Sequence, residues 1–268
     1  MSPDLSFALI LLLRMAVTAA FVVSASVIAE RAGPVIGALV ATLPISAGPS
    51  YVFLAQDHDA AFIAQGTLGS IPANAATMFF CLTYVRLAQH RSVTLSLGGA
   101  MLVWLAIVAM VRMFDWSLTA GIAANAVAFA ICLPLMARYR YAKMPLVTRR
   151  WYDFPLRAAL VATLVATVVT LSHTIGPVGS GMLALYPVAL TSMILLMHPR
   201  IGGIPTAAVI ANSGWGLMGF VLSIVVLHLT AVRLGSAPAL CLALAICVVW
   251  NLGLWSLGRR RVARQALS

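Results

Sequence analysis

Apolar segments long enough to cross a bilayer, about 20 residues each, recur along the whole of this 268-residue chain and constrain its fold most. Inside a bilayer every backbone N–H and C=O must be satisfied within the protein, so only helices and closed barrels span it. Hydrophobic residues make up 62% of the chain and charged residues 9%, a composition that excludes an ordinary soluble domain. The sequence therefore predicts an all-α, polytopic membrane protein.

The hydrophobic pattern predicts about nine membrane helices. They are expected at residues 5–29, 34–55, 61–85, 93–111, 117–137, 153–172, 177–197, 204–230 and 235–257.

An internal duplication, in which the two copies match at one constant offset without a gap, organises the chain. The matched positions include Arg14 and Arg157, Gly33 and Gly176, Pro34 and Pro177, Pro44 and Pro187, and Ser70 and Ser213. Matched alanines and valines mean little in so apolar a chain. A matched arginine within an apolar run and a matched mid-helix proline are far more informative.

The basic residues predict the orientation of the chain in the membrane. The one long polar connection, residues 138–150, carries five of them, and placing it in the cytoplasm fixes every other loop by alternation. With Arg14 and Arg157 set aside as intramembrane, thirteen basic residues then lie inside and two outside. We expect a multi-pass protein of the cell (inner or plasma) membrane, with its N-terminus outside and its C-terminus cytoplasmic.

An odd number of helices makes the two copies insert in opposite directions. Residues 1–112 form the first four-helix repeat, 113–150 a linker helix with the basic loop, and 151–268 the second repeat with a basic tail. Inverted-topology repeats are common in secondary transporters, because two halves of opposite insertion can exchange inward- and outward-facing shapes. The layout resembles several transporter superfamilies built from duplicated units, a likeness that implies no residue assignment.

The two matched arginines are the first candidate site residues. Counted from Leu5, Arg14 falls near the middle of the hydrocarbon layer, where an arginine costs about 2.5–3.5 kcal/mol. Because every carboxylate of the sequence lies at a helix end or in a loop, we expect no acidic partner at that depth and infer a bound anion. Alternatively, Arg157 reaches the interface or pairs with Asp153, and backbone carbonyls satisfy Arg14.

Broken helices are the second candidate feature. Pro44 and Pro187 each fall mid-membrane, where proline removes a backbone hydrogen bond, and the freed N–H groups could bind negative charge. The residues expected to line these breaks are Ser46, Gly48, Ser50, Thr191 and Ser192. The alternative is a packing kink that serine and threonine hydroxyls satisfy.

Amide and hydroxyl side chains form a third layer, with Asn74, Asn212 and Ser213 as candidate substrate-binding residues. Hydrogen bonding between helices is the ordinary role of such groups in membranes.

Several functions find no support in the sequence. The four cysteines and the histidines show no metal-ligand spacing, there is no phosphate-binding loop, and no catalytic cluster can be assembled. We expect neither an enzyme, nor a bound metal or cofactor, nor a nucleic-acid partner.

The sequence favours a secondary transporter with an anion-binding site at the midplane, its passenger a small organic anion or the phosphorylated head group of a lipid. Uniport or anion exchange fits the missing carboxylates better than proton symport, and a lipid passenger would make the protein a flippase. The alternative is a membrane subunit or scaffold whose arginines pair with a partner's carboxylate.

Overall fold

The computed structural model describes residues 3–31, 47–142, 145 and 150–265, and within these ranges the chain forms helices and no β-strand. The helices are α1 (Pro3–Arg31), α3 (Ala47–Asp57), α4 (Ala60–Leu87), α5 (Val93–Val111), α6 (Leu118–Ala137), α7 (Asp153–Ala184), α8 (Val188–Ile201), α9 (Gly203–Leu234) and α10 (Ser236–Gln265). Six of them, α4, α5, α6, α7, α9 and α10, are long and apolar enough to cross a membrane. The expected all-α, multi-pass membrane protein is thus confirmed.

Polar residues between the apolar runs define where helices begin. The Asp59 side chain caps α4 by accepting a hydrogen bond of 2.8 Å from the Phe62 backbone N–H. The Ser117 hydroxyl accepts one of 3.2 Å from the Ala120 N–H and so begins α6. Both residues satisfy N–H groups that the first turn of a helix leaves without a partner.

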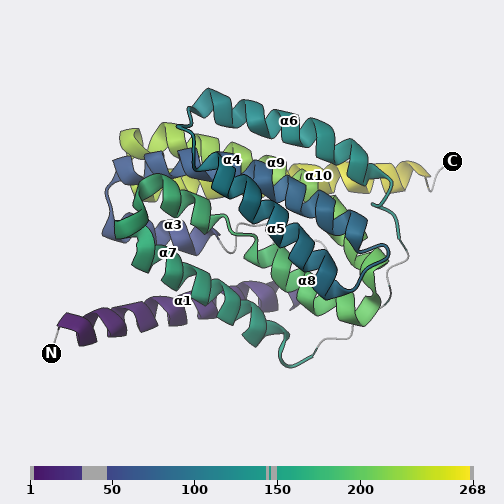
Figure 1. Ribbon diagram of the computed structural model, residues 1–268, viewed down its shortest axis with the longest axis horizontal. Helices are drawn as coiled ribbons and strands as arrows, with labels where there is room; N and C mark the ends of the chain where they lie inside the picture. Colours follow the sequence, from purple (N-terminus) through teal and green to yellow (C-terminus); the bar gives the residue numbers. More distant parts are fainter. Residues whose placement is uncertain (1–2, 32–46, 143–144, 146–149, 266–268) are drawn as a thin grey trace.

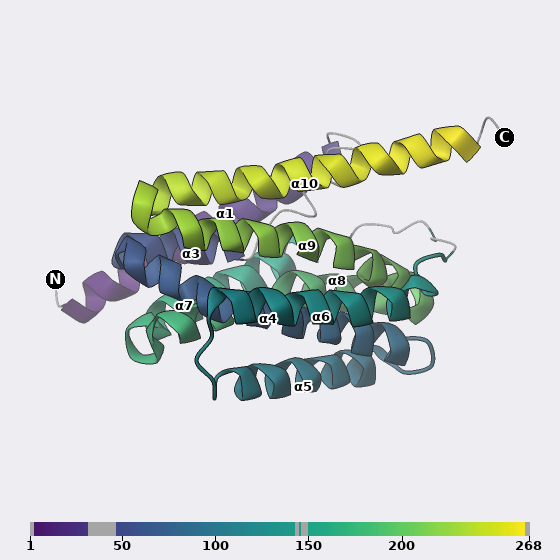
Figure 2. The ribbon, with the colours of Figure 1, turned by 90° about the horizontal axis from the view of Figure 1, so that it is seen from above.

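Helices α4 and α9 form the centre of the bundle, and their contact is the most extensive between any two helices in the described part of the chain. α5 covers α4 on one side, α10 covers α9 on the other, α6 lies mainly on α4, and α1 runs along α7. Figure 2 shows this layering, with α10 and α5 on opposite sides of the molecule. α4 has the most buried of the membrane-spanning windows because helices surround it.

The bundle has two ends, which we name after the connections found there. At the α3–α4 end the chain turns between Asp57 and Ala60, and at the α8–α9 end it turns at Gly202 (Figure 1). The first turns of α1 extend past the rest of the bundle at the α3–α4 end, whereas the last turns of α10 extend past it at the other.

The second half of the chain breaks where glycine and proline predicted. Gly176 has a φ of 71°, which only glycine adopts readily, and divides α7 into two helical parts just before Pro177. α7 then ends at Ala184, and α8 begins after Pro187. The expected helices 153–172 and 177–197 are therefore divided differently: the first junction is a kink within α7, and the full interruption lies at Pro187.

Glycines let the second part of α7 lie directly on α4. A Cβ atom added to Gly181 would lie 1.8 Å from the Gly66 carbonyl oxygen, and one added to Gly69 would lie 2.1 Å from that of Val178. The Ser70 hydroxyl donates a 2.7 Å hydrogen bond to the Gly181 carbonyl across this contact. Small residues at such crossings allow backbones in a membrane to approach closely.

Candidate functional site

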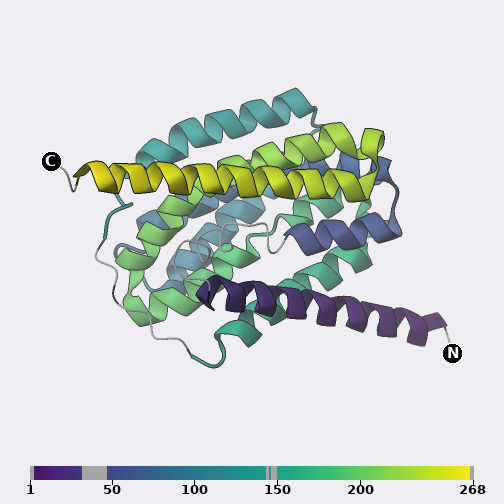
Figure 3. The ribbon, with the colours of Figure 1, turned by 180° about the vertical axis from the view of Figure 1, so that it is seen from behind.

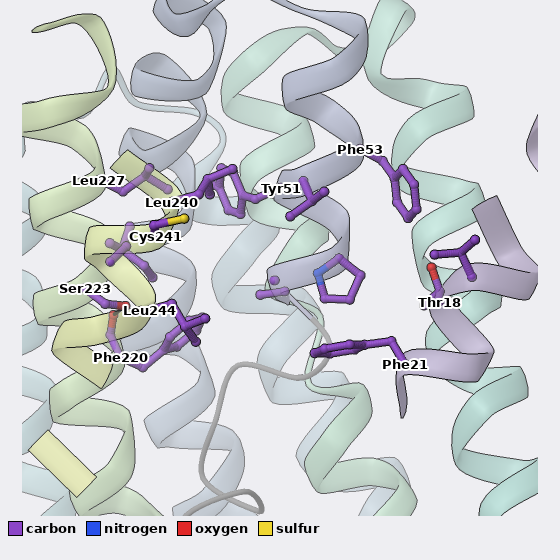
Figure 4. Close-up of a pocket in the computed structure, with 17 residues that line it drawn as sticks. Thr18, Phe21, Tyr51, Phe53, Phe220, Ser223, Leu227, Leu240, Cys241 and Leu244 are labelled. Carbon is purple, nitrogen blue, oxygen red and sulfur yellow. Dashed lines mark hydrogen bonds between the residues drawn. The ribbon is translucent and has the colours of Figure 1, made fainter. Parts of the chain in front are cut away.

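A cavity of about 480 Å³ lies between α1, α3, α9 and α10, and we call it the lateral cavity. Figure 3 shows that α1 and α10 are separated from each other, with α3 visible between them. In Figure 4 the side chains of α1 lie on one side of the cavity and those of α9 and α10 on the other. The volume lies within the range of ordinary ligand pockets, about 300–1,000 Å³.

The polar atoms on the cavity wall are already engaged within the protein. The Thr18 hydroxyl donates to the Arg14 carbonyl at 2.8 Å, and the Ser223 hydroxyl donates to the Phe220 carbonyl at 2.8 Å. The Tyr51 hydroxyl lies 2.6 Å from the Ser70 hydroxyl. Because these groups need no further partner, the cavity presents an apolar surface to a ligand.

Arg14 forms an ion pair with Asp57, so the expectation that it has no acidic partner is wrong. Both terminal nitrogens of its guanidinium donate to the carboxylate, each at 2.5 Å. The two side chains are 15% and 20% exposed, and the guanidinium lies over the Phe53 ring, 5.6 Å from its centroid. Asp57 ends α3, and the first turns of α1, which precede Arg14, extend past the bundle at this end (Figure 1). Arg14 therefore reaches the α3–α4 end of the bundle, where it bonds the last residue of α3.

A second ion pair lies at the opposite end, between Asp153 at the start of α7 and Arg200 near the end of α8. Both terminal nitrogens of Arg200 donate to the Asp153 carboxylate. The Arg200 guanidinium also lies 5.1 Å from the centroid of the Tyr152 ring, and its hydrogen bond lowers the pKa of that phenol. Arg157 interacts electrostatically with the same Asp153 carboxylate, as one of the two sequence alternatives anticipated. The two matched arginines thus lie at opposite ends of the bundle and share no centre.

A histidine cluster adjoins the Arg14–Asp57 pair. The His58 ring stacks on Phe62 at 3.7 Å, lies 4.7 Å from the His173 ring, and bonds the Ser172 hydroxyl at 2.9 Å. Burial lowers the pKa of His58, and the neighbouring His173 lowers it further. The cluster therefore favours a neutral imidazole at the α3–α4 end.

Amides occupy the crossing of α4 with its neighbours. Asn74 donates to Asn125 on α6 at 2.9 Å and to the Leu217 carbonyl on α9 at 3.5 Å. Asn125 donates to the Ile71 and Gly121 carbonyls at 2.7 and 2.9 Å. Asn74, 1% exposed, keeps a buried Oδ1 with no hydrogen-bond partner in the described part of the chain. Its interhelical bonds are those that a structural amide makes in a membrane.

Several other candidate residues are dispersed. The Ser192 and Ser213 hydroxyls bond carbonyls of their own helices, and the buried Thr191 hydroxyl has no partner among the described residues. Asn212 is exposed and bonds Arg140, both by side chain and by backbone, at the α8–α9 end.

Of the first break, only the later part can be placed. Gly48 and Ser50 belong to α3, where Gly48 lines the lateral cavity and Ser50 is fully buried. Pro44 and Ser46 lie outside the described residues.

Comparison with known proteins finds no family model, no curated protein and no solved structure that matches the chain. Within the described residues no group of three or more histidines, cysteines or carboxylates could hold a metal ion. A function must therefore be inferred from the cavity, the ion pairs and the arrangement of the helices.

Sequence reasoning missed both ion pairs, although a signal was present. Asp57 and Arg200 stand at matched positions of the duplication and carry opposite charges. Matching the charged residues that differ between the copies, and not only those that are shared, would have identified Asp57.

Proposed function

We propose that the protein is a membrane carrier built from two four-helix repeats of opposite insertion, and that it moves an anionic, amphipathic molecule such as a lipid with a phosphorylated head group. One contact supports the repeats above all. The Asn74 side chain on α4 bonds the carbonyl of Leu217 on α9, its own counterpart in the second copy. Equivalent residues meet where a two-fold axis relating two copies would pass.

The packing of the other helices agrees with such an axis. α4 packs on α5 as α9 packs on α10, and α3 meets α10 as α8 meets α5. In Figure 1, α4 and α9 run in opposite directions, as do α1 and α7. Antiparallel copies are what oppositely inserted repeats require.

Opposite insertion provides a mechanism of transport. The half that opens at one face of the membrane can exchange its conformation with the other half, so that a central path opens alternately to each face. The excess of basic residues in loops assigned to the cytoplasm supports an external N-terminus and a cytoplasmic C-terminus.

The passenger follows from the surroundings of Arg14. Its guanidinium lies over Phe53, which also lines the lateral cavity, so a cation and an apolar surface adjoin. Within the described part of the chain, Asp57 takes two of its five N–H donors, and the other three could bind a phosphate or carboxylate. Because the arginines lie at opposite ends, an anion would meet one guanidinium on each side of the membrane.

The scaffold alternative loses its main argument. It required carboxylates from a partner protein for Arg14 and Arg157, but Arg14 pairs with Asp57 and Arg157 interacts electrostatically with Asp153, both within the chain. A carrier of this kind should be stable when it is purified alone.

Reconstitution into liposomes tests the proposal. With a fluorescent phospholipid and an impermeant quencher outside, the protein should allow quenching beyond the outer-leaflet share, and Arg14→Gln should slow it. Arg91→Gln, at an exposed position, is the matched control.

A panel of free anions in a thermal-shift assay tests the small-anion passenger. Quenching that stops at the outer leaflet, with no anion raising the melting temperature, would reject the carrier.

A further inference from the structure

We propose that the lateral cavity binds one acyl chain of an anionic phospholipid, with the phosphate held at Arg14. The inference rests on the proposed function only for the identity of the lipid, because a lipid can bind in the cavity without being transported.

The shape of the cavity supports an occupant that enters from the bilayer. Its inner wall is buried, with Tyr51 4% and Leu227 3% exposed, whereas Val17, Phe21 and Val52 at its edge are 45–52% exposed. These edge residues are exposed apolar side chains of α1 and α3. The cavity therefore opens onto an exposed apolar surface, where an acyl chain of the bilayer could enter.

The chemistry of the wall selects a hydrocarbon chain. The Thr18, Tyr51 and Ser223 hydroxyls are all bonded within the protein, so a polar ligand would lose its water without gaining partners. A methylene group gains about 0.8 kcal/mol on leaving water, but a chain that enters from the bilayer has no such gain. Its binding depends instead on close packing against the wall and on the head group.

Arg14 supplies the complementary charge. Thr18, one turn further along α1, lines the cavity and bonds the Arg14 carbonyl, and the guanidinium lies over the cavity residue Phe53. A lipid with its chain in the cavity would thus bring its phosphate to the α3–α4 end, where interfacial head groups belong. Arginine holds phosphate with a planar, permanently charged fork.

The glycines provide matched variants. A Cβ atom on Gly48, in the cavity wall, meets no atom within 4 Å, and the same holds for Gly98 on α5. Gly98 is the counterpart, in the first copy of the duplication, of the cavity residue Cys241. Gly48→Leu therefore adds a side chain to the cavity wall at a position where its first atom has room, whereas Gly98→Leu adds the same side chain elsewhere. Cys241→Leu narrows the cavity from the opposite wall.

Photocrosslinking in nanodiscs tests the inference. A trace of phosphatidylglycerol with a diazirine in its acyl chain should label the buried Tyr51 and Leu227, which surrounding lipid cannot reach.

Gly48→Leu and Cys241→Leu should each reduce that labelling roughly tenfold, the factor that corresponds to about 1.4 kcal/mol. Gly98→Leu should leave it unchanged, and the exposed Leu102 on α5 should be labelled equally in all four proteins. Arg14→Gln should remove any preference over phosphatidylcholine.

Three results would overturn the inference: no adducts on Tyr51 and Leu227, adducts that persist in both filled variants, or a second copy covering the cavity. Of the four cysteines, Cys241 is the only exposed one, so its oxidation to a covalent dimer in nanodiscs would reveal such a copy. Crosslinking without quenching in liposomes would reject the carrier and retain the lipid site. Quenching without cavity adducts would reject the lipid site and retain the carrier.

Discussion

Asp57 and Arg200 occupy matched positions of the duplication, and each forms an ion pair with the helix that begins its half of the chain, but with the charges exchanged. Asp57 accepts from Arg14 on α1, whereas Arg200 donates to Asp153 on α7. Each pair joins the end of one helix to its neighbour, at opposite ends of the bundle. The two segments that match at this offset thus share the location of a polar contact and not the identity of its residues.

Removing one member of the first pair should destabilise the protein. Arg14→Gln leaves the partly buried Asp57 carboxylate without its two donors, and we expect a loss of about 1–3 kcal/mol in the free energy of unfolding. Exchanging the charges, with Arg14→Asp and Asp57→Arg together, should recover part of that loss. Thermal unfolding of the detergent-solubilised protein measures both, with the exposed Arg91→Gln as control. Equal melting temperatures for Arg14→Gln and the parent protein would contradict the ion pair.

The glycine contact between α4 and α7 should tolerate no side chain. Gly181→Ala places a Cβ atom 1.8 Å from the Gly66 carbonyl oxygen, so the two helices must separate, and such overpacking costs about 1–3 kcal/mol. Gly253→Ala is the matched control, because a Cβ atom there meets nothing within 4 Å. Since alanine is the better helix former, the control should be neutral or slightly stabilising. A melting temperature equally unaffected in both variants would show that α4 and α7 do not touch at this point.

Acid should weaken the α3–α4 end through His58. Burial and His173 lower its native pKa below the ordinary value of about 6.5, although Asp57 and Asp59 oppose this shift. Between these two pKa values the unfolded chain binds more protons than the native protein, so stability falls as pH falls through this interval. His58→Gln should reduce the slope of melting temperature against pH below about 6.5, whereas the exposed His90→Gln should preserve it. Identical slopes in all three proteins would exclude His58 as the source.

Cysteine labelling should reveal the orientation in the membrane. With Cys241→Ser as background, Asp115→Cys lies between α5 and α6, and Ser92→Cys lies between α4 and α5. An impermeant maleimide on intact cells should label the first, and the second only after the membrane is permeabilised. The opposite result would invert the proposed orientation, and labelling of both from outside would show that α5 does not cross the membrane.

Local sequence features predicted the six membrane-spanning helices and the interruptions of the second half, although the expected helices 153–172 and 177–197 are divided differently. Apolar runs of sufficient length located the helices, because a bilayer admits few other structures. Gly176 and Pro187 mark the kink and the break of the second half, since the conformations that glycine permits and proline prevents are properties of single residues.

The depth of Arg14 and its partner could not be predicted in the same way. Counting residues from Leu5 placed Arg14 at mid-membrane. In the folded chain α1 packs on α7, and the Arg14 side chain bonds Asp57, 43 residues away. The position of one helix relative to another depends on side-chain packing between distant segments, which no local pattern encodes.

The amino-acid sequence thus determined a helical membrane protein and the kink and break in its second half, since hydrophobicity and backbone preference act over a few residues at a time. Which charges meet, how closely α4 and α7 approach, and where a cavity opens between α1 and α10 emerged only from the folded arrangement. Those features arise from contacts between segments far apart in the chain, and their geometry exists only once the helices have packed.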